Sequence, residues 1–541
     1  MYIIYQNKKG IEYALLAKSV RSNGKVVKKY VNLGRVIDRE RGVYQNRERG
    51  VFTYNAEKNE YGQCPEDVVP PKDVKRGAYY AIDRKRYSLL VLRFGDVFFL
   101  DRFLHQTGIM DVIDAIPYNN KDTLHALVAF YILSPVANCH AQDWYELSYA
   151  KVLYPKAVLS SQRISETLSM LGMEECKRAF FLSYCEFVRK CQMTDTKGNF
   201  GLKEIDDAVL IDSSGLPNDI KMSVTGLNNH NGNISIEVRL IYVVQQKTGL
   251  PLFFRYVSGN VIDATTVKRT IEEMKGLGIN TKFALLDSGY YNGINADILM
   301  NAGISFISRV GTNHNIFKDA VAEFRRNLES KENLVKHNGR VYYIVETKVM
   351  IGEKKDRDAY GYFCLDTVMR NESQKRISAA LADEDMEDGR LYDSMQSAGL
   401  FMLVCTRRIE RQYLLRLYFT RNQVEEIFKI GKGIGKMLPL CVESEGTFRG
   451  HLMVTFITSV ITKILMDKLL NTGLTPEILF SVLQYQIVQI FPEYLLTSEP
   501  VKRMNEIYKH FKIKCPSTID YVPTEDEKKR MGYVLEEAKC G

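Results

Sequence analysis

Two aspartates directly follow short apolar runs and are the first candidates for chemistry. Asp212 follows residues 208–211, and Asp287 follows residues 283–286. Both runs are typical of buried strands, and open α/β sheets place their sites at the carboxyl ends of such strands. An aspartate at a strand end is also a common turn or capping residue. A metal site therefore needs a third acid.

Glu425 is the candidate for that third acid. At about 3.6 residues per turn, a helix would place Tyr418, Arg421, Glu425 and Lys432 on one face. A tyrosine, two cations and an acid on one face can form either a solvent-exposed row of ion pairs or part of a site. Helical periodicity alone favours the ion-pair row.

The spacing Tyr418-x2-Arg421-x3-Glu425-x6-Lys432 resembles the Y-R-E-K signature of a branch of bacterial insertion-sequence transposases. These enzymes are of the DDE class and have an RNase H-like core. In this resemblance Asp212 (LIDSSG) matches the first aspartate, Asp287 (LLDSGYYN) the second, and Glu425 the terminal glutamate. The match spans roughly residues 205–465, including FRYVSGNVIDATTV and RGHLMVTFI, and the N-terminal SNGKVVKKYVNLGRV is a weaker echo.

The resemblance implies that Asp212, Asp287 and Glu425 are the catalytic residues and hold two Mg²⁺ ions, with Mn²⁺ as a substitute. Carboxylate oxygens suit these hard cations, and two ions can activate water and stabilise the leaving oxygen. Arg421 and Lys432 are implied to contact DNA phosphates, and Tyr418 a phosphate or a flanking base. The implied reaction is cut-and-paste movement through a hairpin intermediate.

Glycines 431, 433 and 435 surround Lys432 and weaken a helix there, so Lys429 or Lys436 could contact the phosphate instead. The same glycines imitate a nucleotide-binding loop. The run is one residue too short for G-x4-G-K-[ST], and Met437 stands where Ser or Thr is required, which excludes an ATP site.

The elements that must position these residues read as an α/β fold. Strand-like runs at 208–211, 234–244, 252–257, 283–286 and 304–307 alternate with helical segments at 264–276 and 294–301. This pattern predicts a mixed α/β sheet, with a small β N-terminal module and flanking helical domains. The resemblance implies that the sheet is an RNase H-like core interrupted by a β-rich insertion. A long helical region is expected from about residue 418 to 470.

The expected organisation has five parts. They are a basic β-rich DNA-binding module (1–75), a helical domain (85–200), the catalytic core (205–311 and 400–470), an insertion subdomain (312–399) that holds an acidic stretch at 383–388, and a C-terminal helical region (471–541). In the first part, Asn23-Gly24 between two strand-like runs predicts a β-hairpin.

The net charge of +9 is concentrated at the N-terminus, where residues 8–49 hold 12 Lys/Arg against 4 Asp/Glu. A compact basic module is typical of a polyanion-binding arm, although a merely soluble charged surface is an equal alternative. We expect Lys25, Lys28, Lys29 and Arg35, with Arg39 and Arg41, to read the terminal inverted repeats of the element, with strongly salt-dependent binding.

Composition excludes several classes of protein. With 45% hydrophobic and 26% charged residues, the 541-residue chain is neither disordered nor collagenous. Its ten cysteines form no CxxC pair, and no zinc-binding spacing occurs. Residues 1–10 lack the apolar core of a signal peptide, and residues 452–466 are too short to span a bilayer. We expect a cytoplasmic, nucleoid-associated protein without a membrane partner.

The sequence thus predicts an insertion-sequence DNA transposase that acts as a homodimer on double-stranded element ends and target DNA. Two alternatives remain. One is a catalytically silent, host-adopted DNA-binding protein, and the other is a metal-dependent nuclease that cuts DNA without joining it.

Overall fold

The computed structural model divides the chain into two compact units, Met1–Val91 with Pro523–Gly541 and Leu92–Val522. It describes residues 2–8, 11–22, 25–46, 50–56, 58, 60–65, 68, 91–194, 208–218, 222, 224–230, 233–383, 395–438, 442, 444–491, 493–524 and 527. Each unit is described by itself below.

The first unit is an antiparallel sheet of six strands in chain order. They are β1 (Tyr2–Lys8), β2 (Ile11–Ser22), β3 (Lys25–Asp38), β4 (Val43–Asn46), β5 (Gly50–Asn55) and β6 (Glu60–Gln63). A small core containing Leu16, Leu33, Tyr44 and Phe52 stabilises it. Ser22 pairs with Lys25, which confirms the predicted hairpin, although Asn23 and Gly24 lie outside the described residues.

The second unit is built on a ten-stranded mixed sheet. Its first strands are β8 (Val209–Pro217), β9 (Gly226–His230), β10 (Asn233–Gln245), β11 (Pro251–Ser258), β12 (Phe283–Leu286) and β13 (Ser305–Val310). The spatial order is β11-β10-β8-β12-β13, in which β10 is antiparallel to both β8 and β11, whereas β12 is parallel to both β8 and β13. This order and these directions are the RNase H-like arrangement expected from the sequence.

Strands of the expected insertion extend this same sheet. From β13 the order continues through β17 (Leu400–Cys405), which falls in the expected core, and then through the insertion strands β16 (Arg357–Asp366), β15 (Arg340–Ile351) and β14 (Leu334–His337), all antiparallel. Helices α11 (Asn315–Phe324) and α12 (Thr367–Asp383) belong to this part of the chain, with the short η4 (Lys331–Asn333) between them. Most of the acidic stretch, from residue 384, lies outside the described residues.

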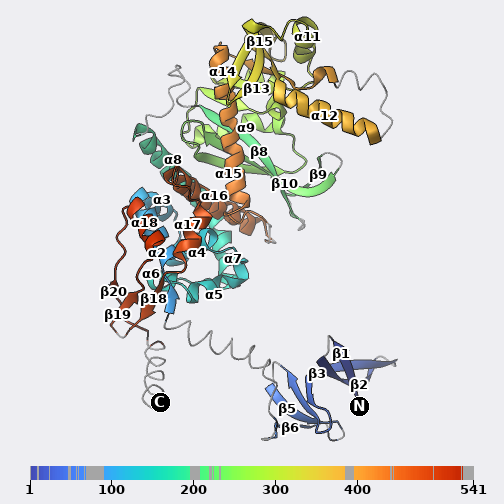
Figure 1. Ribbon diagram of the computed structural model, residues 1–541, viewed down its shortest axis with the longest axis vertical. Helices are drawn as coiled ribbons and strands as arrows, with labels where there is room; N and C mark the ends of the chain where they lie inside the picture. The colour runs from blue at the N-terminus through green and yellow to red at the C-terminus, as the bar shows by residue number, and fades with distance from the viewer. Residues whose placement is uncertain are drawn as a thin grey trace. The chain divides into compact units, whose positions relative to one another are not determined.

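Helices cover the sheet and form a region at one end of it (Figure 1). Before the sheet come α2 (Gly95–Thr107), α3 (Ile109–Asp114), α4 (Lys121–Leu133), η1 (Asn138–His140), α5 (Ala141–Glu146), α6 (Ala150–Leu153), α7 (Ser161–Leu171) and α8 (Glu174–Thr194). Within the sheet's sequence come η2 (Asp263–Thr266), α9 (Val267–Gly276), η3 (Ser288–Tyr290) and α10 (Gly293–Asn301).

The helical region expected from residue 418 to 470 is broken rather than continuous. It consists of α14 (Arg411–Tyr418), the 3₁₀ turn η5 (Phe419–Arg421), α15 (Asn422–Lys432) and α16 (Glu445–Lys468). Helix α15 ends at Lys432 because Gly433 leaves helical geometry, and Lys436 then takes a positive φ of 54°. Ser444 caps the start of α16 by accepting a hydrogen bond from the Thr447 backbone.

The segment 471–541 contains strands as well as the expected helices. Helices α17 (Pro476–Leu483) and α18 (Lys502–His510) alternate with β18 (Ile487–Ile490), β19 (Tyr494–Thr497) and β20 (Thr518–Asp520). These strands form a small sheet with β7 (Val91–Arg93). Alternating burial in β18 and β19, too short to stand out in the sequence, marks them as half-buried strands.

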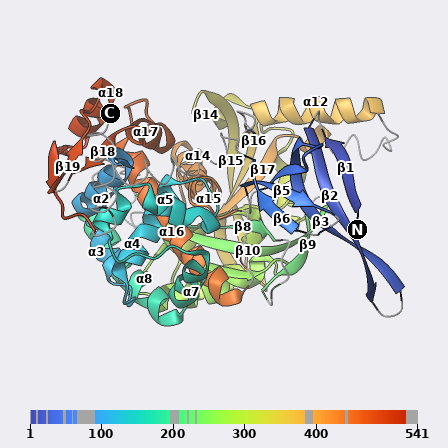
Figure 2. The same ribbon diagram turned by 90° about the horizontal axis from the view of Figure 1, so that it is seen from below.

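Helix α16 packs between the helices that precede the sheet in sequence, mainly α4 and α7, and the ten-stranded sheet (Figure 2). The Phe456 ring contacts Phe181 of α8 at 5.2 Å and Phe254 of β11 at 5.3 Å. Among the described residues, α16 is the one helix long and apolar enough to cross a bilayer. Within the protein, 83% of its most apolar 18-residue segment is buried. One further candidate, α4 with the helices over Asn138–Glu146, passes only as a pair bent by 117°.

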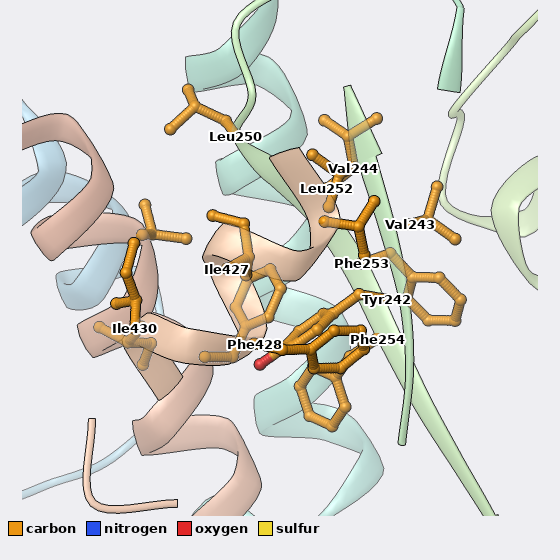
Figure 3. Packing of buried hydrophobic residues seen from close by; sticks show 14 of the residues in the cluster. Tyr242, Val243, Val244, Leu250, Leu252, Phe253, Phe254, Ile427, Phe428 and Ile430 are labelled. Atoms are coloured by element: carbon orange, nitrogen blue, oxygen red, sulfur yellow. The ribbon is translucent and has the colours of Figure 1, made fainter. Parts of the chain in front are cut away.

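Helix α15 lies on the sheet through its apolar face. Ile427 and Phe428 lie toward the β10 and β11 side chains (Figure 3), and the Phe428 ring lies 5.0 Å from that of Tyr242. Because the apolar side of α15 is fixed in this way, its polar residues are held near β8 and the end of β12.

A close helix crossing allows a stability prediction. A Cβ atom added at Gly450 in α16 would overlap the carbonyl oxygen of Leu168 in α7. We expect Gly450→Ala to lower the free energy of unfolding by about 1–3 kcal/mol, the usual cost of overpacking, or by more. Gly276→Ala, where the new methyl group meets nothing within 4 Å, is the matched control and should be neutral or stabilising. Equal melting temperatures for the two variants in calorimetry would contradict the close crossing.

Candidate active site

Adjacent parallel strands bring the two aspartates together. Leu286 of β12 pairs with Ile211 of β8, so the next residues of the two strands, Asp287 and Asp212, lie side by side near the carboxyl end of β12. Residues 209–211 and Phe283–Leu286 are all buried, which fixes this register. Asp287 is held further by Ser308 of β13, whose hydroxyl donates to the Asp287 carbonyl oxygen at 3.2 Å.

Helix α15 supplies the third acid beside these two aspartates. Glu425 is the outward neighbour of the buried Val424 and Ile427. Glu426, the next residue, faces a different direction, since its carboxylate pairs with Lys463 of α16 at 2.9 Å. Lys463 also pairs with Asp467 at 3.0 Å. The structure therefore separates the two neighbouring glutamates, with Glu425 on the side of the aspartates.

The guanidinium of Arg421 joins the three acids. It lies 3.0 Å from Asp212, 3.5 Å from Asp287 and 3.4 Å from Glu425. These contacts lie in an open pocket of about 680 Å³ lined by Asp212, Ser213, Ser214, Asp287, Arg421, Glu425, Phe428, Lys429, Lys432 and Gly433. Acids far apart in the sequence thus share one cation.

Partial burial perturbs the carboxyl group of Asp212. Its side chain is only 14% exposed, and burial raises its pKa to about 6 despite the opposing effect of Arg421. Asp287 and Asp263 raise the pKa further by repulsion. The pocket therefore disfavours additional negative charge unless a cation accompanies it.

The donor chemistry of the pocket fits hard divalent cations, since three carboxylates face it. In the described part of the chain, however, no three His, Cys, Asp or Glu side chains are grouped closely enough to hold an ion. The carboxylates converge on the guanidinium instead. A metal ion can be held by Asp212, Asp287 and Glu425 only after Arg421 withdraws from between them.

The predicted phosphate-contacting residues are placed differently from one another. Lys432 donates to the Ser214 hydroxyl at 2.6 Å and to the Gly215 carbonyl oxygen at 3.2 Å, and burial lowers its pKa. Lys429 also lines the pocket. Lys436 instead lies 3.3 Å from the Phe130 ring centre, where burial lowers its pKa to about 7.

Lys436 therefore points away from the acids. Its ammonium group donates to the Val136 carbonyl oxygen at 2.8 Å. Tyr418 is also buried, and burial raises its pKa to about 12, so its hydroxyl is neutral at physiological pH. Tyr418 is not among the residues that line the pocket.

A further acid lies behind Asp212. The Ser213 hydroxyl donates to Asp263 at 2.6 Å, and Arg239 of β10 pairs with Asp263 at 2.9 Å. The Asn295 side-chain amide donates to the carbonyl oxygens of Ala264 and Tyr290, which ties the Asp263 turn to the turn after Asp287. Asp263 lies within FRYVSGNVIDATTV, so the motif was visible in the sequence, but no strand end marked this residue.

The predicted DNA-binding residues of the N-terminal module belong to the other unit. The side chains of Lys25, Lys28 and Lys29 lie outside the described residues, and Arg35 of β3 is partly buried. Arg39 lies over the Tyr5 ring at 4.1 Å and pairs with Glu12 at 3.4 Å. DNA binding by this module stays a prediction.

Among solved structures, the piggyBac transposase synaptic complex with hairpin DNA is 10% identical, covering 68% of this chain and 70% of that chain with a TM-score of 0.35. The Drosophila P element transposase strand transfer complex is also 10% identical, with 60% and 84% coverage and a TM-score of 0.15. No curated protein matches the chain.

A family model described as "Transposase DDE domain" matches residues 206–461. This range begins just before β8, ends within α16, and includes every residue that lines the acid pocket. The matched range is slightly less than half of the 541-residue chain. The acid pocket therefore lies within a segment that is similar to the DDE transposase domain family.

Proposed function

We propose that this chain is the DNA transposase of a bacterial insertion sequence of the Y-R-E-K branch, which cuts element ends and joins them to target DNA. One observation carries the proposal. Carboxylates from β8, the end of β12 and α15 reach a single guanidinium in one open pocket, and two lysines line its rim. An open pocket of this kind suits a polyanionic substrate, since its basic side chains can bind phosphates and its carboxylates can hold the cations needed for cleavage.

Asp212, Asp287 and Glu425 would hold two divalent ions, Mg²⁺ or Mn²⁺. When bound, such a pair supplies an activated water and stabilises the leaving 3′-oxygen of a phosphodiester. The half-buried Asp212 would be the anchoring ligand, because it pairs with Tyr242 of β10 and directly follows Ile211, which pairs with Leu286 of β12. The more exposed Asp287 and Glu425 would adjust around the scissile phosphate.

Arg421 would then exchange one set of anions for another. Without metal it offsets the repulsion among the three acids, and with metal its guanidinium is free to pair with a DNA phosphate. Lys432, whose ammonium group is held by Ser214 and Gly215, would meet the neighbouring phosphate. These two cations would place the scissile bond over the acids.

In the proposed sequence of reactions, water first nicks one strand at each element end. The freed 3′-hydroxyl attacks the opposite strand to form a hairpin, which is reopened before the end joins target DNA. A homodimer in the cytoplasm would pair two ends, and the basic N-terminal module would read their terminal repeats. The two alternative functions, a silent DNA-binding protein and a nuclease that does not join, predict different products from the same DNA.

The first prediction concerns the third acid. On a labelled duplex carrying the terminus of the element, Mg²⁺ should support nicking and hairpin formation by the wild type, and Glu425→Gln should lower the rate at least about 100-fold because a metal-binding carboxylate is lost. Glu426→Gln is the matched control, since Glu426 pairs with Lys463, and it should retain most activity.

Three other results would contradict parts of this proposal. Binding without cleavage by the wild type would favour the silent DNA-binding protein. Nicks that are never joined to target DNA would favour the nuclease. Loss of cleavage in Glu426→Gln, with cleavage retained in Glu425→Gln, would exchange the roles of the two glutamates.

The second prediction concerns Arg421. In EDTA, Arg421→Ala should lower the melting temperature, since three acids lose the charged hydrogen-bond donor that they share, an effect of about 1–3 kcal/mol. Added Mg²⁺ should raise the melting temperature of this variant more than that of the wild type, because the ions no longer compete with the guanidinium. Arg163→Ala, which removes an exposed arginine paired with Glu166, should show the wild-type response to Mg²⁺. An equal Mg²⁺ response in Arg421→Ala and wild type would show that Arg421 does not occupy the metal position.

A further inference from the structure

A second hollow of about 780 Å³ lies in the same unit, along the outer strand of the sheet. It is bounded by β11, by α9 on one side, and by the first turns of α8 and α16 on the other. None of its lining residues lines the acid pocket. The chemistry of this hollow is therefore separate from that of the three acids.

Cations outnumber acids in this hollow. Its walls carry Lys177, Arg178, Arg255, Arg269 and Arg449, against Glu174, Glu273 and Glu445. Glu273 lies 3.5 Å from Arg255 and 3.3 Å from Arg269, and Glu445 pairs with Arg449. In the described part of the chain, neither Lys177 nor Arg178 has an acid within ion-pair distance.

The two cations of α8 are instead presented to the hollow. The Lys177 ammonium group lies over two aromatic rings of β11, 5.8 Å from the Phe253 centroid and 5.9 Å from that of Phe254. Arg178 is exposed. Behind them, the buried Arg255 also lines the hollow, where its guanidinium pairs with Glu273 and donates to Thr266 and Thr270. A positively charged groove is typical of surfaces that track a nucleic-acid backbone.

Strand register places this hollow level with the acid pocket. Asp212 of β8 pairs with Tyr242 of β10, and Tyr242 pairs with Phe254 of β11. Two strand spacings amount to about 10 Å across the sheet. Duplex DNA carries a phosphate charge about every 1.7 Å along its axis, so DNA engaged at the acids has many phosphates within that span.

We propose that the hollow between α8, β11, α9 and α16 is a second DNA contact, which binds phosphodiester groups of the duplex through Lys177 and Arg178. The proposal rests on the proposed function, because it takes the ligand to be the DNA cut at the acid pocket. Arg255, Arg269 and Arg449 supply background positive charge, and the three glutamates limit that charge. Such a contact is independent of base sequence and fixes how the duplex lies across the sheet.

The test is the salt dependence of DNA binding by the full chain, measured by fluorescence anisotropy of a labelled duplex carrying the element terminus. The double variant Lys177→Gln/Arg178→Gln should bind several-fold more weakly at low salt. Loss of two phosphate contacts should reduce the slope of log affinity against log salt by about 1.8. Glu174→Gln, which removes an acid from the hollow, should strengthen binding.

The matched control is Arg163→Gln/Lys190→Gln, which removes the same charge from exposed positions on α7 and α8 outside the hollow. It should keep the wild-type slope. A wild-type slope for Lys177→Gln/Arg178→Gln, in a variant with a wild-type melting temperature, would overturn the proposal. Inorganic phosphate provides a second check. If phosphate displaces the DNA at concentrations that leave the slope of log affinity against log salt unchanged, the hollow is a site for a free anion, and the proposal is also overturned.

Failure of this inference can be told apart from failure of the proposed function. If the wild type nicks the duplex in Mg²⁺ and the double variant binds it with an unchanged slope, only the second contact is wrong. If the wild type neither binds nor nicks the duplex, the proposed function itself is wrong. If Lys177→Gln/Arg178→Gln binds DNA as the wild type does but binds an acidic peptide more weakly than the wild type does, the hollow is assigned to a protein partner.

Discussion

Repulsion among three carboxylates is the constraint on which this site depends. Asp212, Asp287 and Glu425 are drawn to one edge of the sheet, where burial already raises the pKa of Asp212 to about 6. Each added anion increases the free energy of the pocket unless a cation offsets it. Arg421 does so by reaching all three acids, and it comes from the 3₁₀ turn that precedes α15. The same helix junction thus supplies both an acid and its counter-ion.

The surrounding structure keeps these charges in place without contributing to the chemistry itself. Parallel pairing of β8 and β12 sets the two aspartates side by side, and packing of Phe428 on Tyr242 fixes the rotation of α15. The buried Lys463 holds Glu426 on the opposite side, which leaves Glu425 to face the pocket. Behind Asp212, the contacts among Ser213, Asp263 and Arg239 connect the first acid to β10 and to the η2 turn. Rigid positioning of this kind is what a site built on strands and a packed helix can provide.

Much of this arrangement follows from local sequence patterns, and the rest depends on tertiary contacts. Apolar runs before Asp212 and Asp287 marked two buried strand segments, and Asn23-Gly24 marked a hairpin, since both signals are local. Asp287 follows the end of β12 as expected, whereas β8 continues to Pro217, so Asp212 lies within its strand and not at its end. The break between α14 and α15 was not visible, because Tyr418, Arg421 and Glu425 keep helical spacing through the 3₁₀ turn. The insertion strands join the central sheet through pairing between β16 and β17, and β17 itself pairs with β13, nearly 100 residues earlier in the chain. Asp263 follows no apolar run, and the burial of Lys436 against Phe130 requires a helix 300 residues away.

We propose that the three acids form one divalent-metal site once Arg421 withdraws. The most direct measurement is electron paramagnetic resonance of Mn²⁺ bound to the full chain with the element-end duplex, in the wild type and in Asp212→Asn. The account predicts the spin-coupled signal of two ions about 3.5–4 Å apart in the wild type, and its loss in the variant. Isolated Mn²⁺ signals in the wild type, or a coupled signal that survives Asp212→Asn, would contradict it.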